Sequence, residues 1–388
     1  MKTPPALDID ALLDDRGTEI IVCCGSGGVG KTTTSAALAL RAAERGRKVV
    51  VLTIDPARRL AQSMGIEQLD NSPRPVPLPG HGDGGTASGG SLDAMMLDMK
   101  RTFDEVVESQ ASPEKAQQIL QNPFYVALSS SFAGTQEYMA MEKLGQLHRQ
   151  ALADGRYDLI VVDTPPSRSA LDFLDAPERL SSFLDGRLIR LLVAPARGPA
   201  RLMTAGFSVV TNALAKILGG QMLRDVQTFV TALDTLFGSF RQRAEKTFAL
   251  LQADATAFVV VAAPEPDALR EAAYFVDRLT DDDMPLAGLV VNRVSPSAHT
   301  DLSAEAAIAA ADRLRTGDSA SLTAGLLQLH ADRVRIVERE QHLRERFTAS
   351  HPQVPTALVP ALAGDVHDLD GLREIGERLA DQAWVGQR

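Results

Sequence analysis

Cys23–Thr34 has the sequence Cys-Cys-Gly-Ser-Gly-Gly-Val-Gly-Lys-Thr-Thr-Thr, and this stretch decides which fold the 388-residue chain adopts. It matches the phosphate-loop pattern, in which a glycine is followed by four residues and then by glycine, lysine and threonine. The apolar segment Ile20–Cys23 precedes the loop, and Ala36–Ala43, which has the composition of a helix, follows it. Backbone N–H groups in such a loop, together with the positive end of the following helix dipole, attract a polyphosphate. The stretch therefore predicts a strand, a nucleotide-binding loop and a helix in that order.

The loop also contains the side chains that a nucleotide site needs. We expect Lys31 to reach the β- and γ-phosphates, and the hydroxyl group of Thr32 to ligate Mg²⁺. The alternative is a glycine-rich turn without a ligand, against which the order of strand, Lys-Thr pair and helix argues. Glycines let the backbone fold around the phosphates, and the backbone positions expected to bind the nucleotide are Gly27, Gly28, Val29 and Gly30.

The composition is that of a globular protein. Apolar residues make up 45% of the chain, and the formal net charge of −10 argues against a surface that binds nucleic acid. The first residues lack the apolar core of a signal peptide, and no apolar run is long enough to span a bilayer, so we expect a cytoplasmic protein. The only two cysteines, Cys23 and Cys24, are neighbours in the predicted strand and should point to opposite faces. We therefore expect two buried thiols rather than a disulfide bond.

Further strands alternate with helical segments along the chain. Continuous apolar runs of strand length are typical of a parallel sheet that is covered on both faces. This alternation predicts an α/β fold with a doubly wound, mostly parallel sheet. The predicted strands after the first one are 48–54, 94–97, 159–163, 258–262, 286–292 and 355–360.

Two long helical segments interrupt this alternation, so we divide the chain into a nucleotide-binding core and two helical inserts. Residues 72–91 are rich in proline, glycine and small polar residues, and we expect them to form a mobile surface loop. The core comprises 17–99, 154–177 and 254–388, and the inserts are 100–153 and 178–253.

Polar residues at the carboxyl ends of the predicted strands are the candidates for chemistry, because ligands bind at that edge of a doubly wound sheet. Asp55 could orient a water molecule that attacks the γ-phosphate, although an Asp before a Pro is also a common helix N-cap. Asp163 is expected to hold Mg²⁺, directly or through water, and the turn Thr164–Ser169 that follows it would sense the γ-phosphate. Asn292 ends another strand, and its carboxamide can pair with adenine, although Asn is also common in turns.

Taken together, the motifs resemble those of one family. Gly-Ser-Gly-Gly-Val-Gly-Lys-Thr-Thr, Asp-Pro-Ala, Val-Val-Asp-Thr-Pro-Pro-Ser and Val-Asn-Arg follow one another as in the deviant phosphate-loop ATPases. Within these, the chain is most similar to the arsenite-pump ATPase (ArsA) branch, which includes the targeting ATPase for tail-anchored membrane proteins. The Ala- and Arg-rich composition resembles that of an actinobacterial member.

The resemblance implies a phosphate-loop fold of the SIMIBI type and a dimer that closes around Mg-ATP. It implies that Thr33 binds phosphate with the rest of the loop, and that Lys31 and Asp55 are the catalytic residues. The first switch would be Asp55, Pro56 and Ala57, the second Asp163, Thr164, Pro165 and Pro166, and the adenine site Asn292 and Pro360.

Three features depart from the family pattern. Ser26 stands where the family usually has a lysine that contacts the nucleotide across the dimer. A serine cannot supply that charge, so hydrolysis in a homodimer would be slow, or a related subunit with the lysine would complete the site. The chain also lacks the scattered cysteines of the arsenite pump and the Cys-x-x-Cys pair that shares zinc between the subunits of the targeting ATPases. Neither arsenite coordination nor a zinc-bridged dimer is expected.

The second insert contains an unusually apolar segment. Residues 192–223 carry many Leu, Met, Val and Phe residues at helical spacing. They either form an ordinary helix that packs on its neighbours, or line a nucleotide-gated groove for a hydrophobic client.

The expected function is an ATP-hydrolysing dimeric switch that couples Mg-ATP to the capture or delivery of a hydrophobic or membrane-associated client. It would work as a homodimer, or as a heterodimer with a related ATPase that carries the signature lysine, with peripheral membrane contact and without nucleic acid. One alternative is a weakly or non-hydrolysing regulatory subunit, which Ser26 favours. The other is a positioning ATPase similar to the septum-site and partition proteins (MinD and ParA). The acidic balance and the lack of a basic amphipathic helix at 369–388 argue against it.

Overall fold

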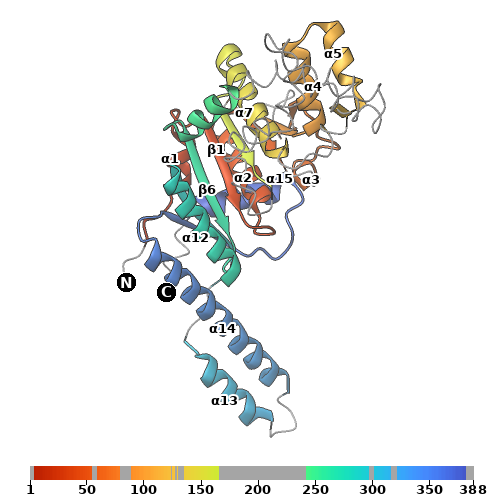
Figure 1. Cartoon of the computed structure of the whole chain (residues 1–388). Helices are drawn as coiled ribbons and strands as arrows, with labels where there is room; N and C mark the ends of the chain where they lie inside the picture. The colour runs from red at the N-terminus through yellow and green to blue at the C-terminus, as the bar shows by residue number, and fades with distance from the viewer. Residues whose placement is uncertain are drawn as a thin grey trace, which may run out of the picture.

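The fold is a single eight-stranded sheet with helices on both faces (Figure 1). The computed structural model describes residues 4–54, 59–78, 89–123, 125, 126, 129, 135–165, 242–296, 301–315 and 321–381. The strands are β1 (Ile20–Gly25), β2 (Lys48–Thr53), β3 (Arg74–Pro75), β4 (Ser91–Met96), β5 (Leu159–Asp163), β6 (Thr256–Ala262), β7 (Leu286–Val294) and β8 (Thr356–Pro360). Their order in the sheet is β3-β4-β2-β5-β1-β6-β7-β8, and every pairing is parallel except that of β3 with β4. The prediction of a doubly wound, mostly parallel α/β sheet is confirmed.

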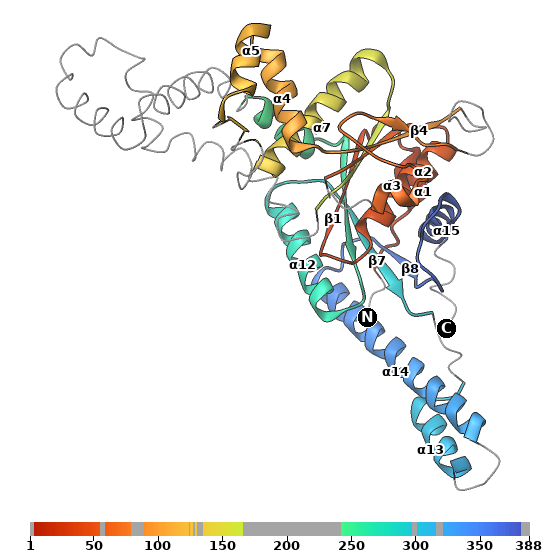
Figure 2. The same ribbon diagram turned by 90° about the vertical axis from the view of Figure 1, so that its right-hand side faces the viewer.

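Most of the described helices form two layers around this sheet. In chain order they are α1 (Ile9–Asp14), α2 (Lys31–Glu44), α3 (Arg59–Ser63), α4 (Met99–Gln110), α5 (Pro113–Leu120), α7 (Thr135–Asp154), α12 (Pro266–Asp281), α13 (Ala304–Arg315), α14 (Ser321–Ser350) and α15 (Leu369–Ala380). A further helix spans 242–252. Figure 2 shows α1, α2, α3 and α15 on one face of the sheet and α4, α7 and α12 on the other.

Each face of the sheet has its own apolar cluster, which explains why the strands are continuously apolar. Ile21 and Cys23 belong to the cluster with α2 and α15, whereas Val22 and Cys24 belong to the cluster with α4, α7 and α12. Both thiols are buried and free, and they face opposite sides of the sheet as predicted. Burial raises the pKa of the Cys23 thiol to about 12 and raises that of Cys24 as well, so both stay protonated and unreactive at neutral pH.

The first helical insert is more closely joined to the core than its sequence indicates. In the predicted insert 100–153, Phe103 of α4 and Leu144 of α7 belong to the same buried cluster as Ile20 and Val22 of β1. Helix α7 leads directly into β5, so it is a covering helix of the sheet. Residues 166–241 lie outside the described part of the chain, and with them most of the predicted second insert, 178–253, and the apolar segment 192–223.

The predicted mobile loop 72–91 is wrong at both of its ends. Arg74–Pro75 pairs with β4 as an antiparallel edge strand, and Ser91 already belongs to β4. Val76 and Leu78 are buried against the core. A two-residue strand is too short to have an alternating pattern of its own and exists only through its pairing with β4. The Pro- and Gly-rich composition of 72–91 therefore gave no sign of it. Residues 79–88 lie outside the described part of the chain.

The amino-terminal segment, which the predicted core left out, also packs on the sheet. Leu7, Ile9 and Leu13 are buried, and Ala6 forms a bridge with Thr356 of β8. Arg41 of α2 holds α1 through two hydrogen bonds to the Asp10 carboxylate, of 2.6 and 2.8 Å.

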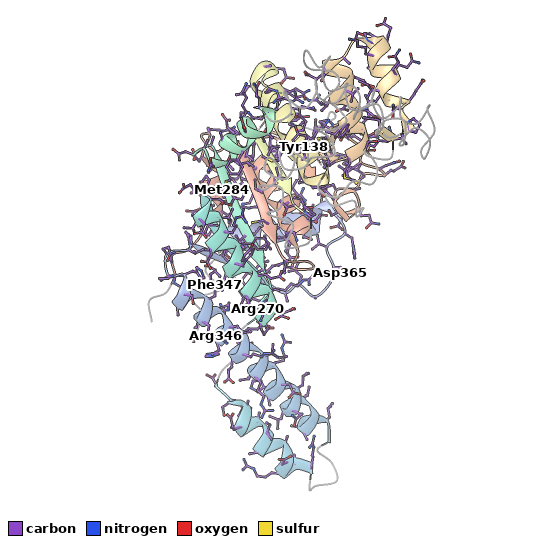
Figure 3. The ribbon with its side chains drawn as sticks, viewed as in Figure 1. Tyr138, Arg270, Met284, Arg346, Phe347 and Asp365 are labelled. Carbon is purple, nitrogen blue, oxygen red and sulfur yellow. The ribbon has the colours of Figure 1, made fainter. Side chains whose placement is uncertain are left out.

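Helices α13 and α14 form an arm that projects from the body (Figures 1 and 2). Alanines and a valine on their facing sides are buried: Ala304 and Ala307 of α13, and Ala331 and Val334 of α14. The other end of α14 is anchored to the body, where Phe347, labelled in Figure 3, joins the core cluster that contains α12.

Candidate nucleotide site

The phosphate loop joins β1 to α2 at the carboxyl edge of the sheet, next to the strands β5 and β6. Its turn requires glycine at two positions. Gly25 has φ 148°, and a Cβ atom there would lie 2.1 Å from the carbonyl oxygen of Val261. Gly30 has φ 96°, and its Cβ atom would lie 2.2 Å from Nδ2 of Asn292. Left-handed backbone and close neighbours together make these glycines necessary for the loop conformation.

Lys31 begins α2 and its side chain folds back over the loop. Its Nζ atom donates a 2.7 Å hydrogen bond to the backbone carbonyl oxygen of Ser26, and the residue is 5% exposed. The ammonium group is thus held inside the loop, where a phosphate would meet it. Gly27 and Gly28 are exposed, Val29 is buried, and Thr33 is half-buried.

Asp163 is the last residue of β5, and its side chain bonds to the phosphate loop. Its Oδ2 atom accepts a 2.8 Å hydrogen bond from the hydroxyl group of Thr32 and a 2.9 Å hydrogen bond from that of Thr53. Asp163 lies between Cys23 and Thr53 in the sheet register, which places the three strand ends side by side. The predicted partners Thr32 and Asp163 are therefore brought together.

Thr53 is a site residue that the sequence analysis missed. It is the last residue of β2, it is 1% exposed, and its hydroxyl group donates to the carboxylate expected to hold the metal. A Thr at a strand end is a weak signal. Only its position two residues before the predicted switch residue Asp55 could have pointed to it.

The start of the predicted second switch is held against β1. Thr164 donates to the carbonyl oxygen of Cys23 from both its hydroxyl group, at 2.8 Å, and its backbone N–H, at 3.3 Å. Pro165 is half-buried. Pro166 lies outside the described residues, as do Asp55, Pro56 and Ala57, which were predicted to form the first switch.

The predicted adenine residues lie at the same edge. Asn292 is 8% exposed, and its Nδ2 atom donates a 2.9 Å hydrogen bond to the carbonyl oxygen of Val29 in the loop. Its Oδ1 atom accepts from the backbone N–H of Arg293, a residue with φ 60°. Pro360 pairs in register with Val294, so the end of β8 lies beside the end of β7.

The donor set at the loop fits Mg²⁺. Thr32 and Asp163 present a hydroxyl and a carboxylate oxygen 2.8 Å apart, and oxygen ligands of this kind suit a hard divalent cation. Magnesium sites of this class use few protein ligands and take the others from phosphate and water. In the described part of the chain, no cluster of three or more His, Cys, Asp and Glu side chains is arranged to hold a metal ion.

A loop of this geometry, with a lysine turned inward and a threonine joined to the acid of a neighbouring strand, defines a phosphate-loop nucleotide-binding protein. The model of one family, described as "Anion-transporting ATPase" (ArsA ATPase), matches residues 18–313. The match covers most of the chain, which therefore belongs to the ArsA ATPase family, as its motifs predict.

Several curated proteins are similar to this chain over most of its length. "ATPase GET3" of Candida glabrata is 26% identical over 297 residues, which cover 74% of this chain and 75% of that protein. "ATPase BagA" of Mycobacterium tuberculosis is 26% identical over 383 residues, 94% of each chain. The "ATPase ASNA1 homolog" of Cryptosporidium parvum is 26% identical over 270 residues, which span 70% of this chain but only 63% of that protein. Within the described ranges, no helix has the length and apolar content needed to cross a lipid bilayer.

Proposed function

We propose that this chain binds Mg-ATP in the loop between β1 and α2, hydrolyses it, and uses the γ-phosphate to switch the segment that follows Asp163. The observation that carries the proposal is the hydrogen bond between Thr32 and Asp163. It joins the phosphate loop directly to the first residue of the second switch, so a ligand that displaces Thr32 must also affect Asp163.

Each residue has a distinct part in this chemistry. Lys31, held inside the loop by Ser26, would neutralise the β- and γ-phosphates. Thr32 and Asp163 would hold Mg²⁺, which supplies positive charge to the phosphates during hydrolysis. Thr53 would keep the Asp163 carboxylate in place through its own hydrogen bond. Asp55 would accept a proton from the attacking water, a role that rests on its place in the sequence.

The switch would start at Thr164. Its two hydrogen bonds to Cys23 tie the beginning of the second switch to β1, the strand that leads into the phosphate loop. A change in the position of Asp163 on loss of the γ-phosphate would therefore reach the segment after Pro165. That segment leads into the insert 178–253, which we propose as the element that captures a hydrophobic or membrane-associated client.

Dimer formation is the second part of the proposal. The family resemblance implies a dimer that closes around the nucleotide, and Ser26 leaves each site without the charge that the family lysine supplies. A homodimer would hydrolyse ATP slowly, whereas a related subunit with the lysine would complete the site in a heterodimer. Ser26 also favours the second candidate function, a regulatory subunit in which bound ATP is a structural ligand.

The test is the affinity of the purified chain for Mg-ATP, measured by calorimetry for the wild type and for Lys31→Ala. We expect Lys31→Ala to weaken binding at least about 100-fold, because it removes the only loop cation. Lys48→Ala is the matched control. It removes a lysine from the amino end of β2, a strand that β5 separates from β1, where Nζ donates to the carbonyl oxygen of Gly155, and it should leave the affinity unchanged.

Unchanged affinity in Lys31→Ala would refute the nucleotide assignment. Turnover measured on the same samples separates the two functions: the ATPase releases phosphate, and the regulatory subunit binds ATP with the same dependence on Lys31 but without turnover.

A further inference from the structure

The carboxyl end of β7 contains a bulge in its pairing with β8, the neighbouring strand in Figure 2. Val291 pairs with Leu358 of β8. The next pair is Val294 with Pro360, so β7 advances by three residues where β8 advances by two. Within this bulge Arg293 has φ 60°, a left-handed conformation that is uncommon for a residue other than glycine. Bulges of this kind re-aim a side chain and occur often beside functional sites.

The bulge decides which side chains of β7 share a face of the sheet. In a regular strand, Val294 would face away from Val291, because the two are an odd number of positions apart. Instead, both belong to the apolar cluster that contains α12. Val290 lies on the other face, in the cluster that contains α2 and Val29 of the phosphate loop. Asn292 follows Val290 by two positions, and its buried carboxamide meets the loop on that side.

The contact of Asn292 with the loop fixes the orientation of one peptide unit. Its Nδ2 atom donates a 2.9 Å hydrogen bond to the carbonyl oxygen of Val29. In a planar trans peptide unit the C=O and N–H bonds point in opposite directions, so the N–H of Gly30 points away from Asn292. Gly30 is the N-cap of α2, and backbone N–H groups at this place in a phosphate loop are those that contact phosphates.

The loop contact uses only part of the hydrogen-bonding capacity of the carboxamide. A carboxamide has two N–H donors and two acceptor lone pairs. One N–H of Asn292 is used by Val29, and one lone pair accepts from the backbone N–H of Arg293 at 2.9 Å. Pairing with adenine would use the others, so the loop contact is a separate task that needs no base. A ligand with phosphates but without a base separates the two tasks.

We propose that Asn292 is a positioning residue of the phosphate loop. The bulge in β7 aims its carboxamide at Val29, and this hydrogen bond holds the N–H of Gly30 towards the phosphates before a nucleotide binds. This inference rests on the proposed function, in which the loop binds the phosphates of ATP. Val29 is buried, so loss of the carboxamide would leave its carbonyl group without this donor and favour rotation of the peptide unit.

The first test is the affinity of Asn292→Ala for Mg-tripolyphosphate, measured by calorimetry beside that for Mg-ATP. Asn71→Ala is the matched control. It removes a similarly buried carboxamide near the end of β4, where Nδ2 donates to Glu105, and β2 and β5 separate that strand from β1. We expect Asn292→Ala to weaken Mg-tripolyphosphate binding at least about tenfold and Asn71→Ala to change it less than about twofold, because only the first change frees the loop.

The second test measures deuterium exchange in peptides that cover residues 23–34, without nucleotide. We expect the loop amides of Asn292→Ala to exchange at least about tenfold faster than those of the wild type, and those of Asn71→Ala to keep the wild-type rate. This measurement needs no ligand, so it decides the question even where Mg-tripolyphosphate binds too weakly to measure.

A third pair of variants tests the bulge without touching Asn292. Arg293→Gly and Arg293→Val both remove the same exposed side chain, so neither disturbs the core. Glycine adopts φ 60° without strain, whereas a β-branched residue does not. We expect Arg293→Val to bind Mg-tripolyphosphate at least about fivefold more weakly than Arg293→Gly.

Several results would overturn the inference. If Asn292→Ala loses affinity for Mg-ATP alone, with Mg-tripolyphosphate binding unchanged, Asn292 serves adenine and not the loop. Equal loop exchange in Asn292→Ala and Asn71→Ala would exclude a specific hold on the loop, and equal affinities of the two Arg293 variants would exclude the role of the bulge. A wild type that does not bind Mg-ATP would refute the proposed function, which is a different result from unchanged loop exchange.

Discussion

Replacing Thr53 with valine tests whether the buried hydroxyl group at the end of β2 supports Asp163. Thr53 and Asp163 are 1% and 0% exposed, and their hydrogen bond measures 2.9 Å. Valine has nearly the same shape, so the change removes one hydrogen bond to an ionised group, and water cannot reach the carboxylate to replace it. A hydrogen bond of this kind contributes about 1.5–3 kcal/mol. We expect Thr53→Val to lower the free energy of unfolding by about 2 kcal/mol in urea titrations.

The matched control is Thr256→Val, in which an equally buried threonine loses a 2.8 Å hydrogen bond to a neutral carbonyl oxygen, that of Leu250. That change should cost only about 1 kcal/mol. Thr53→Ser keeps the hydroxyl group and should recover most of the loss. In the presence of ATP, Thr53→Val should also raise the Mg²⁺ concentration needed for binding about 10- to 100-fold, as expected for a residue that orients a metal ligand. If Thr53→Val is no less stable than Thr256→Val, or needs no more Mg²⁺ than the wild type, the reasoning about Asp163 is wrong.

Asp55→Asn should keep Mg-ATP affinity and lower phosphate release at least about 100-fold, and full turnover in a phosphate-release assay would leave Asp55 as a helix cap only. Ser26→Lys should raise the turnover of the homodimer at least about tenfold in the same assay, because it restores a charge at the nucleotide; unchanged turnover would refute this explanation. Asp10→Asn should lower the free energy of unfolding by up to about 1 kcal/mol at pH 7, because hydrogen bonds from Arg41 hold the pKa of Asp10 below its ordinary value of 3.8. That stabilisation is present above pH 3.8 and is lost as the pH falls through the lowered pKa, so the two proteins should become equally stable in acid; a difference that persists there would contradict the assignment.

The parts of the molecule that could be predicted are those encoded over short distances along the chain. The phosphate loop needs glycines and a Lys-Thr pair at fixed spacing, and each parallel strand needs a continuous apolar run because both of its faces are covered. Cys23 and Cys24 are buried on opposite faces of the sheet because successive side chains of a strand point to alternate sides. The positions of Asp163 and Asn292 beside the phosphate loop could be predicted because both residues end strands of one parallel sheet, whose carboxyl ends share an edge.

The features that were missed depend on partners far away in the sequence. Thr53 joins the site because β2 and β5 pair in the register that sets it beside Asp163, 110 residues later. The edge strand Arg74–Pro75 exists only because β4 accepts it. Helix α1 has only six residues, too few for a periodic signal, and it packs on α2 and α15.

The phosphate loop in Cys23–Thr34 and the apolar strands by themselves determined that this chain folds as a phosphate-loop α/β protein, because backbone conformation and strand burial are local properties of residue type. The motifs later in the chain then indicated the ArsA family. The tertiary structure decided which hydroxyl groups meet the Asp163 carboxylate and which apolar side of α14 remains exposed on the arm. Helical spacing shows that α14 has apolar residues on two sides, but only the packing of α13 selects the side that is buried. Register and packing arise between distant segments, and no local pattern of residues contains them.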